Sequence, residues 1–328
     1  MEPETHSPIA EPTITARAPM RTSSIGALAM VLVVAAVSFG FFQFSAVPVP
    51  EKAQTAAAAI APSPFDGIQL ISKAAVVIDI QTGKTLYEHN ADAQLPLASL
   101  TKVAMALAVA EVLPTDDVIT IPYNTLWSSN ADPLRKGDRW RVRDVLDYTL
   151  IASSNEGADI LAAAADDRLH ARFPQSPADG ATLWRMNDLA QSLGLSGTYF
   201  LNVNGLDIST TQSGAYGSAR DVAKLFAYAA SAQPSLFAGT AEDGELLTSV
   251  NGKNTTLPTN TNESRGRISG LIMGKTGLTD LAGGNLAVVY DVGLAHPVVA
   301  VVLGSTKDGR FDDIQKLVAA SRLSIAQQ

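Results

Sequence analysis

The chain has 328 residues, of which 46% are hydrophobic and 17% are charged, a composition typical of a folded enzyme with a sizeable core. Its formal net charge of −8, without any basic run, argues against a nucleic-acid-binding protein. The absence of cysteine excludes a cysteine nucleophile, a disulfide framework and a thiolate metal site. The four histidines lie apart and none belongs to an H-E-x-x-H pattern, so we expect neither a zinc site nor another cofactor.

The N-terminal region predicts a membrane anchor. Residues 25–47 form an uncharged run of about 23 residues, which as a helix spans the roughly 30 Å hydrocarbon core of a bilayer. Arg17 and Arg21 precede the run and indicate a cytoplasmic N-terminus. A cleaved signal peptide is the alternative, because small residues follow at 53–61, although its apolar region is normally shorter. The expected organisation is a disordered cytoplasmic tail at 1–24, a single transmembrane helix at 25–47, a linker at 48–66 and an extracytoplasmic catalytic domain at 67–328.

The exported part predicts a mixed α/β (α+β) fold. A β-branched run at 74–80 and a second strand-like segment at 85–89 flank a turn that contains Gly83 and predict a hairpin. Helical patterns follow at residues 99–112, 143–152, 156–169, 181–193 and 218–230, and a last helix is expected at 308–325. Strand-like runs occupy residues 267–274, 285–292 and 298–304. Strands at both ends with helices between them predict one sheet made from the two chain ends, with a helical lobe inserted.

The first candidate for chemistry is Ser99-Leu100-Thr101-Lys102. On a helix, positions i and i+3 share a face, so the Ser99 hydroxyl and the Lys102 amine are expected to meet. A lysine with a lowered pKa can serve as the base that activates a serine nucleophile. Burial near a second cation would lower the pKa of Lys102, and Lys275 is the candidate for that cation. Chance alone produces about one S-x-x-K pattern in such a chain, so this motif is not decisive by itself.

Two further short motifs follow along the chain. Ser153-Ser154-Asn155 lies at the junction of two predicted helices, where a helix N-cap is the simpler interpretation. Lys275-Thr276-Gly277 ends a strand-like run, and it is either a turn or an edge where a peptide carboxylate docks and an added substrate strand pairs. The order S-x-x-K, S-x-N, K-T-G, with separations of about 50 and about 120 residues, is the motif set of penicillin-binding proteins and class A β-lactamases.

The chain resembles the low-molecular-weight penicillin-binding proteins of the D-alanyl-D-alanine carboxypeptidase family from Ala74 to Leu323. Beyond the three motifs, the stretches that carry this resemblance are the hairpin segment 79–87, Pro96–Lys102, Asn204–Asp207, Ser218–Asp221, Lys275–Gly283 and Gly304–Phe311. The resemblance implies a β-lactamase/transpeptidase-like fold with an antiparallel sheet flanked by helices. It also implies peptidoglycan peptide as the substrate and β-lactam antibiotics as covalent inhibitors.

The same resemblance implies a role for each motif residue. Ser99 would be acylated, and Lys102 would deprotonate it. Ser153 and Asn155 would relay protons and bind the substrate amide, and the backbone of Leu278 would complete the oxyanion hole with that of Ser99. The residues that would hold the terminal carboxylate are Lys275, Thr276 and Gly277, with additional charge from Arg310. The sequence departs from the family pattern at Asn204, where a histidine is usual. We expect that departure to affect substrate preference and not the acyl chemistry.

The expected activity is a serine-type D-Ala-D-Ala carboxypeptidase that trims peptidoglycan peptides through an acyl-Ser99 intermediate. A D-alanyl endopeptidase of the same family is the first alternative. A serine β-lactamase is the second, and it would need a carboxylate that activates water; Glu156 follows Asn155 directly, and there is no separate E-x-x-x-N pattern. The third is a non-catalytic protein that binds wall peptide. A Ser-His-Asp triad is disfavoured because no G-x-S-x-G elbow exists.

Overall fold

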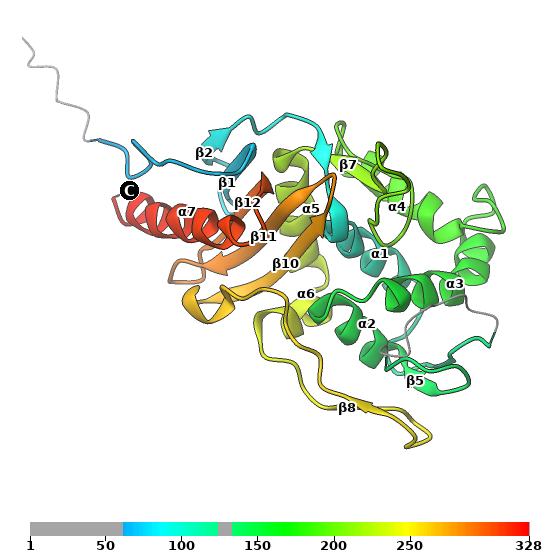
Figure 1. The fold of residues 1–328 in the computed structure, drawn as a ribbon. Helices are drawn as coiled ribbons and strands as arrows, with labels where there is room; N and C mark the ends of the chain where they lie inside the picture. Colours follow the sequence, from blue (N-terminus) through cyan, green and yellow to red (C-terminus); the bar gives the residue numbers. More distant parts are fainter. Residues whose placement is uncertain (1–61, 124–132, 328) are drawn as a thin grey trace, which may run out of the picture. The chain divides into compact units, whose positions relative to one another are not determined.

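The computed structural model describes residues 62–123 and 133–327 (Figure 1). The predicted cytoplasmic tail, transmembrane helix and most of the linker therefore lie outside the described residues. Within those two ranges, none of the helices combines the length and the apolar character needed to cross a membrane.

A five-stranded antiparallel sheet, in the order β10-β11-β12-β1-β2, lies at the centre of the fold (Figure 1). Its strands are β1 (Ala74–Asp79), β2 (Thr85–His89), β10 (Leu271–Thr279), β11 (Gly283–Asp291) and β12 (Pro297–Ser305). In β1, Val76 lies opposite both Glu88 of β2 and Val301 of β12. The prediction that both chain ends contribute to one sheet is therefore confirmed.

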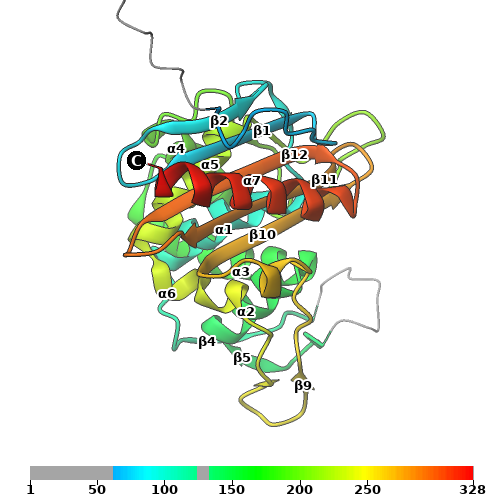
Figure 2. The same cartoon turned by 90° about the vertical axis from the view of Figure 1, so that its left-hand side faces the viewer.

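Both faces of the sheet are buried along β1, β11 and β12, which explains why these three strands are rich in valine and alanine. Helix α7 (Gly309–Ala326) covers one face, as Figure 2 shows, and α5 (Ala219–Ala232) packs on the other. Because side chains alternate along a strand, β12 divides its residues between two cores. Val299 and Val301 belong to the core that the sheet shares with α5 and the helical lobe, whereas Val298 and Val302 belong to the core between the sheet and α7.

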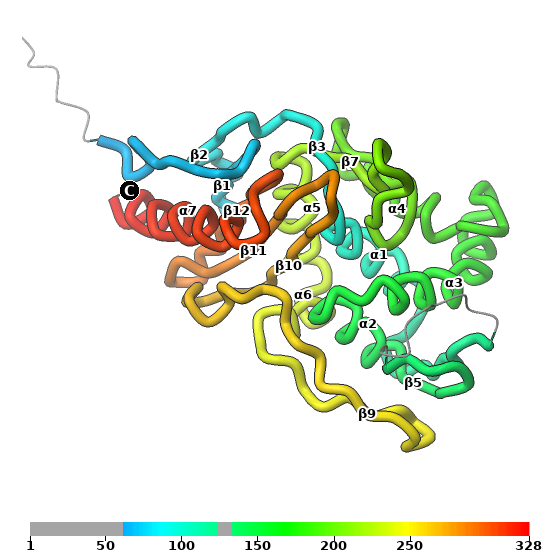
Figure 3. Tube along the Cα trace, viewed as in Figure 1, coloured from blue at the N-terminus to red at the C-terminus, as the bar shows by residue number. Residues whose placement is uncertain are grey.

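A helical lobe lies between β2 and β10 in the chain, as predicted. Its helices are α1 (Thr101–Ala110), α2 (Val142–Ile151), α3 (Asn155–Arg172), α4 (Ala181–Ser192), α5 and the short α6 (Pro234–Phe237). The 3₁₀ turns are η1 (Ala98–Leu100), η2 (Ala238–Ala241) and η3 (Arg265–Arg267). The short strands are β3 (Leu95–Pro96), β4 (Val118–Thr120), β5 (Arg139–Arg141), β6 (Tyr199–Phe200), β7 (Ala215–Gly217), β8 (Leu247–Thr248) and β9 (Thr255–Thr256). The hairpin of β8 and β9 projects beside β5 (Figure 3), where Val250 N donates to Arg139 O at 2.7 Å.

Strand β10 differs from its prediction. The apolar pattern indicated a strand over 267–274 that ended before Lys275, but the strand covers 271–279 and contains the whole Lys275-Thr276-Gly277 motif. The preceding residues form η3 and a turn at Gly270, whose φ is +68°. Backbone pairing with β11, in which Thr276 lies opposite Leu286, extends the strand through Lys275 and Gly277, two residue types that are depleted in strands. The motif therefore lies within an edge strand, not in a turn.

Candidate active site

The turn that carries Ser99 has an unusual backbone. Ser99 lies in η1, directly before α1, and the preceding Ala98 has a φ of +49°, a left-handed conformation that alanine rarely adopts. Two glycines pack closely against this turn. A Cβ at Gly205 would lie 2.0 Å from Ala98 O, and one at Gly277 would lie 2.8 Å from Leu97 O. Glycine at both positions lets the cleft walls approach the serine.

Lys102 is fully buried directly behind Ser99. Its Nζ lies 2.9 Å from Ser99 Oγ, 2.7 Å from Asn155 Oδ1 and 2.6 Å from the carbonyl oxygen of Asn204. All three partners are neutral, so they hold the amine without neutralising its charge. When the amine is unprotonated, the same short contact allows the Ser99 hydroxyl to donate its proton to Nζ.

Burial lowers the pKa of Lys102 to about 7, although Asp159 and Glu156 act in the opposite direction. The sequence correctly indicated a pKa of Lys102 lowered by burial, but the second expected cause, the cation of Lys275, is not among the groups that act on Lys102. Repulsion between the two lysines acts on Lys275. Burial, then Lys102, then Arg310 lower the pKa of Lys275 well below its ordinary value.

Ser153 and Asn155 lie at the junction of α2 and α3, where two functions were predicted for one segment. Ser154 is the N-cap of α3, and its hydroxyl accepts from Gly157 N at 2.9 Å. Ser153 has a φ of +63°, and its Oγ accepts from Lys275 Nζ at 2.8 Å. Ser154, between the two motif positions, therefore caps the helix, while the side chain of Asn155 contacts Lys102 and that of Ser153 contacts Lys275.

The Lys275-Thr276-Gly277 segment forms the opposite wall of the site. Thr276 Oγ1 lies 2.7 Å from Thr261 Oγ1, and Lys275 Nζ also donates to Thr276 O at 3.1 Å. Arg310, which is 4% exposed, donates through Nη1 to Gly277 O at 2.8 Å. The structure therefore brings one lysine, Lys275, and one arginine, Arg310, to the same wall.

A cleft of about 880 Å³ opens between the helical lobe and β10. The predicted site residues that line it are Ser99, Ser153, Asn155, Thr276, Leu278 and Arg310, while Lys102 and Lys275 lie buried next to it. Ser99 and Leu278, predicted to form the oxyanion hole, are both among the lining residues. Within the described residues, no group of three or more histidine or acidic side chains could hold a metal ion.

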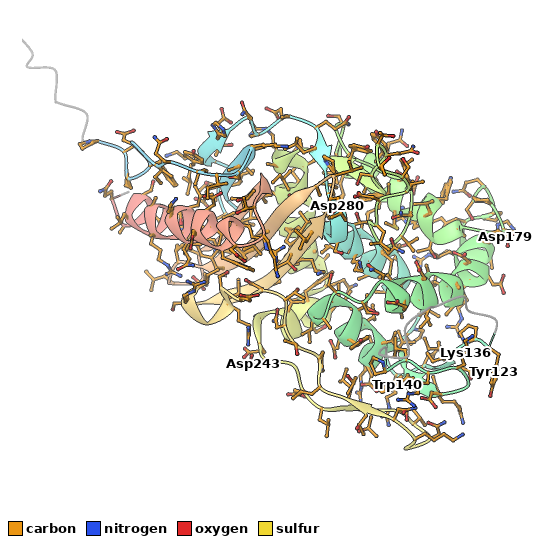
Figure 4. The ribbon with its side chains drawn as sticks, in the orientation of Figure 1. Tyr123, Lys136, Trp140, Asp179, Asp243 and Asp280 are labelled. Carbon is orange, nitrogen blue, oxygen red and sulfur yellow. The ribbon has the colours of Figure 1, made fainter. Side chains whose placement is uncertain are left out.

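The motifs did not reveal the segment from Asn204 to Asp207. The Asp207 carboxylate accepts hydrogen bonds from Thr279 Oγ1 at 3.0 Å and from Leu281 N at 3.1 Å. These two donors flank Asp280, which Figure 4 labels at the turn between β10 and β11. Asn204 contacts Lys102 through its backbone carbonyl oxygen, so this contact does not depend on the departure from the family pattern at this position. The N-G-L-D stretch in the sequence was the available signal.

Comparisons with known proteins agree with this geometry. A profile of the D-alanyl-D-alanine carboxypeptidase family matches residues 55–307. The chain is 30% identical to D-alanyl-D-alanine carboxypeptidase DacB2 of Mycobacterium tuberculosis, over 71% of this chain and 75% of that protein. It is also 30% identical to the D-alanyl-D-alanine endopeptidase of Escherichia coli, over 81% and 80%. Penicillin-Binding Protein D2 from Listeria monocytogenes, solved in its cefotaxime-bound form, is 28% identical with a TM-score of 0.63, covering 77% of this chain and 98% of that one.

Proposed function

Since the chain belongs to the D-alanyl-D-alanine carboxypeptidase family, we propose that it is a serine peptidase that removes the terminal D-alanine of peptidoglycan peptides through an acyl-Ser99 intermediate. The observation that carries this proposal is the contact of 2.9 Å between Lys102 Nζ and Ser99 Oγ, with a base whose pKa is about 7. A base with that pKa is half unprotonated near neutral pH, which suits general base catalysis.

Acylation begins when the Ser99 hydroxyl transfers its proton to Lys102 Nζ and its Oγ bonds to the carbonyl carbon of the penultimate D-alanine. The backbone N–H groups of Ser99 and Leu278 are the proposed donors to the resulting oxyanion. Ser153 Oγ accepts from Lys275, so its own proton is available for the nitrogen of the departing D-alanine. The C–N bond then breaks, Ser153 regains a proton that originates from Lys102, and an ester on Ser99 remains.

Hydrolysis of that ester regenerates the enzyme. Water attacks the ester carbonyl carbon and gives a proton to Lys102, the bond to Ser99 Oγ breaks, and Ser99 recovers a proton from Lys102. The same base therefore serves both steps, and no metal or cofactor is part of this scheme.

The wall around Lys275 suits a terminal carboxylate. Lys275, Thr276 and Arg310 supply two positive groups and a hydroxyl in one place, and an entering carboxylate would offset the repulsion between the cations. Because β10 is an edge strand, an extended peptide can also pair with its free backbone groups.

A fluorescent penicillin tests the acyl chemistry. We expect stable covalent labelling of the full chain, and loss of labelling in Ser99→Ala with an unchanged thermal unfolding temperature. Absence of labelling in the unaltered, folded protein would contradict the proposal and would favour a non-catalytic protein that binds wall peptide. Rapid turnover of the label would favour a β-lactamase. Such an enzyme needs a carboxylate that activates water, and Glu156, which follows Asn155 in the chain, is not among the residues that line the cleft.

An endopeptidase is the second candidate function, and the similarity to the Escherichia coli endopeptidase favours it as strongly as the carboxypeptidase relative favours the first. Mass spectrometry separates the two. A carboxypeptidase releases free D-alanine from a pentapeptide, whereas an endopeptidase converts cross-linked dimers to monomers. We expect release of D-alanine from the pentapeptide. Conversion of dimers to monomers without D-alanine release would instead support the endopeptidase function.

We also propose a location: residues 25–47 anchor the chain in the cell membrane, with the catalytic domain on the extracytoplasmic side. Support comes from the length of the uncharged run and from Arg17 and Arg21 before it. Protease added to intact spheroplasts should digest the catalytic domain while a tag before residue 17 stays protected. N-terminal sequencing of the mature protein would reveal a cleaved signal peptide if this proposal is wrong.

A further inference from the structure

Asp159 is a charged residue beside the reaction centre that belongs to none of the three motifs. It lies on α3 one turn after Asn155, so both residues share a helix face. Its Oδ1 accepts a hydrogen bond from Asn204 Nδ2 at 3.0 Å. The carbonyl oxygen of the same Asn204 makes the shortest of the three contacts of Lys102 Nζ, at 2.6 Å. Asn204 therefore connects the Asp159 carboxylate to the catalytic base.

Asn204 lies in a turn that is held at several other points. Its Oδ1 accepts from Leu206 N at 2.9 Å, and Asn202 Oδ1 accepts from Gly205 N at 2.7 Å. Asp207 fixes the far end of the turn to the β10–β11 connection. The hydrogen bond from Asn204 to Asp159 joins the turn to α3 in the helical lobe. Loss of this bond would leave the turn attached to the sheet but less constrained beside Lys102.

We propose that Asp159 is a positioning residue for acylation, which acts through Asn204 to hold the carbonyl oxygen that fixes Lys102 against Ser99. This inference rests on the proposed function, in which Lys102 is the base that activates Ser99.

The charge of Asp159 has a second effect, separate from its hydrogen bond. A nearby carboxylate favours the protonated form of Lys102, and Asp159 and Glu156 on α3 both raise the pKa of Lys102 against the effect of burial. Lys275 on β10 is the cation that faces Lys102 from the other side. Asp159 therefore positions the base while it also keeps more of that base protonated, and these two effects predict opposite consequences for two substitutions.

The test measures the second-order rate constant of acylation by a fluorescent penicillin between pH 5 and pH 9. Asp159→Asn retains an acceptor oxygen for Asn204 but removes the charge, so the acidic limb of the profile should move to lower pH, with about threefold faster acylation below the limb for a half-unit shift. Asp159→Ala removes the acceptor, so the plateau rate above the limb should fall about tenfold because Lys102 is held less precisely. Asn204→Ala should match Asp159→Ala, and the double variant should lose no more than either single variant.

Asp166 provides the matched control, because it is a carboxylate on the same helix that is not among the charges acting on Lys102. It accepts hydrogen bonds from Gly180 N and Thr182 N at 3.1 and 2.8 Å, before and within the first turn of α4. Asp166→Asn should lower the unfolding temperature without moving the acidic limb or the plateau.

An unchanged limb in Asp159→Asn, together with a plateau in Asn204→Ala within twofold of the parent, would refute this inference even if Asp159→Ala does not fold. Failure of the unaltered protein to react with penicillin would refute the proposed function, and the inference with it. If the parent protein reacts with penicillin but the variants have the same pH profiles of acylation as the parent, the inference alone is refuted.

Discussion

Two fully buried lysines lie on opposite walls of the cleft in different electrostatic surroundings. Lys102 on α1 contacts three neutral oxygens and lies near two carboxylates, Asp159 and Glu156, so burial lowers its pKa only to about 7. Lys275 on β10 instead faces two cations, Lys102 and Arg310, and both add to burial in lowering its pKa. Residue type and burial are the same, so the charges nearby assign the roles: one lysine exchanges protons near neutral pH, and the other awaits a substrate carboxylate.

The largest expected effect comes from removing the amine of Lys102, which tests its role as the general base. Lys102→Met fills the buried space without an amine, so acylation of Ser99 by penicillin should slow about 10³-fold through loss of the general base. Stopped-flow labelling measures the rate, and thermal unfolding checks that the fold is intact. A rate within tenfold of the parent would show that Lys102 is not the base.

The next effect concerns the second lysine. Lys275→Met should lower kcat/KM about 10²-fold for a peptide with a free terminal carboxylate, because a buried charge-assisted hydrogen bond is lost. The same peptide with a C-terminal amide is the matched substrate, and it should lose far less. Equal losses for both substrates would mean that Lys275 acts on the chemistry and not on carboxylate recognition.

The pH dependence sharpens the contrast between the lysines. Neutral Lys102 is the active form, and a lysine is neutral above its pKa, so acylation should rise about tenfold per pH unit below about 7 and level off above it. The profile of the second-order rate constant checks this in the free enzyme. A limb near the ordinary lysine pKa of about 10 would contradict the assignment.

The smallest effect belongs to Arg310. Its guanidinium donates to Gly277 O and lies at the carboxylate wall, so Arg310→Gln should raise KM for the free carboxylate peptide about fivefold, which corresponds to about 1 kcal/mol. The amide peptide should be nearly unaffected, and kcat should change little. A large fall in kcat for both peptides would indicate that Arg310 mainly shapes β10.

Local patterns predicted much of the fold and the identities at the site. The β1–β2 hairpin and the helices near 143–152 and 181–193 follow from β-branched runs and amphipathic spacing, and the structure has them within two residues. The polar end of β10 was missed because the apolar pattern stops at Gly274, whereas pairing with β11 continues the strand through residues 275–279. The cap at Ser154 was predictable in kind, but which of two adjacent serines forms it depends on the positive φ of Ser153.

The sequence by itself determined which groups are present: one S-x-x-K, the S-x-N at Ser153, which is one of three in the chain, and one K-T-G, in the order of a known family of serine peptidases. Only the tertiary structure decided their electrostatics. The pKa of Lys102 depends on burial among α1, α3 and the turn at Asn204, whose residues lie about 50 and about 100 positions away along the chain, and desolvation arises only when such distant segments pack together. The same packing brought Asp159 within reach of Asn204, a contact that no spacing in the sequence reveals.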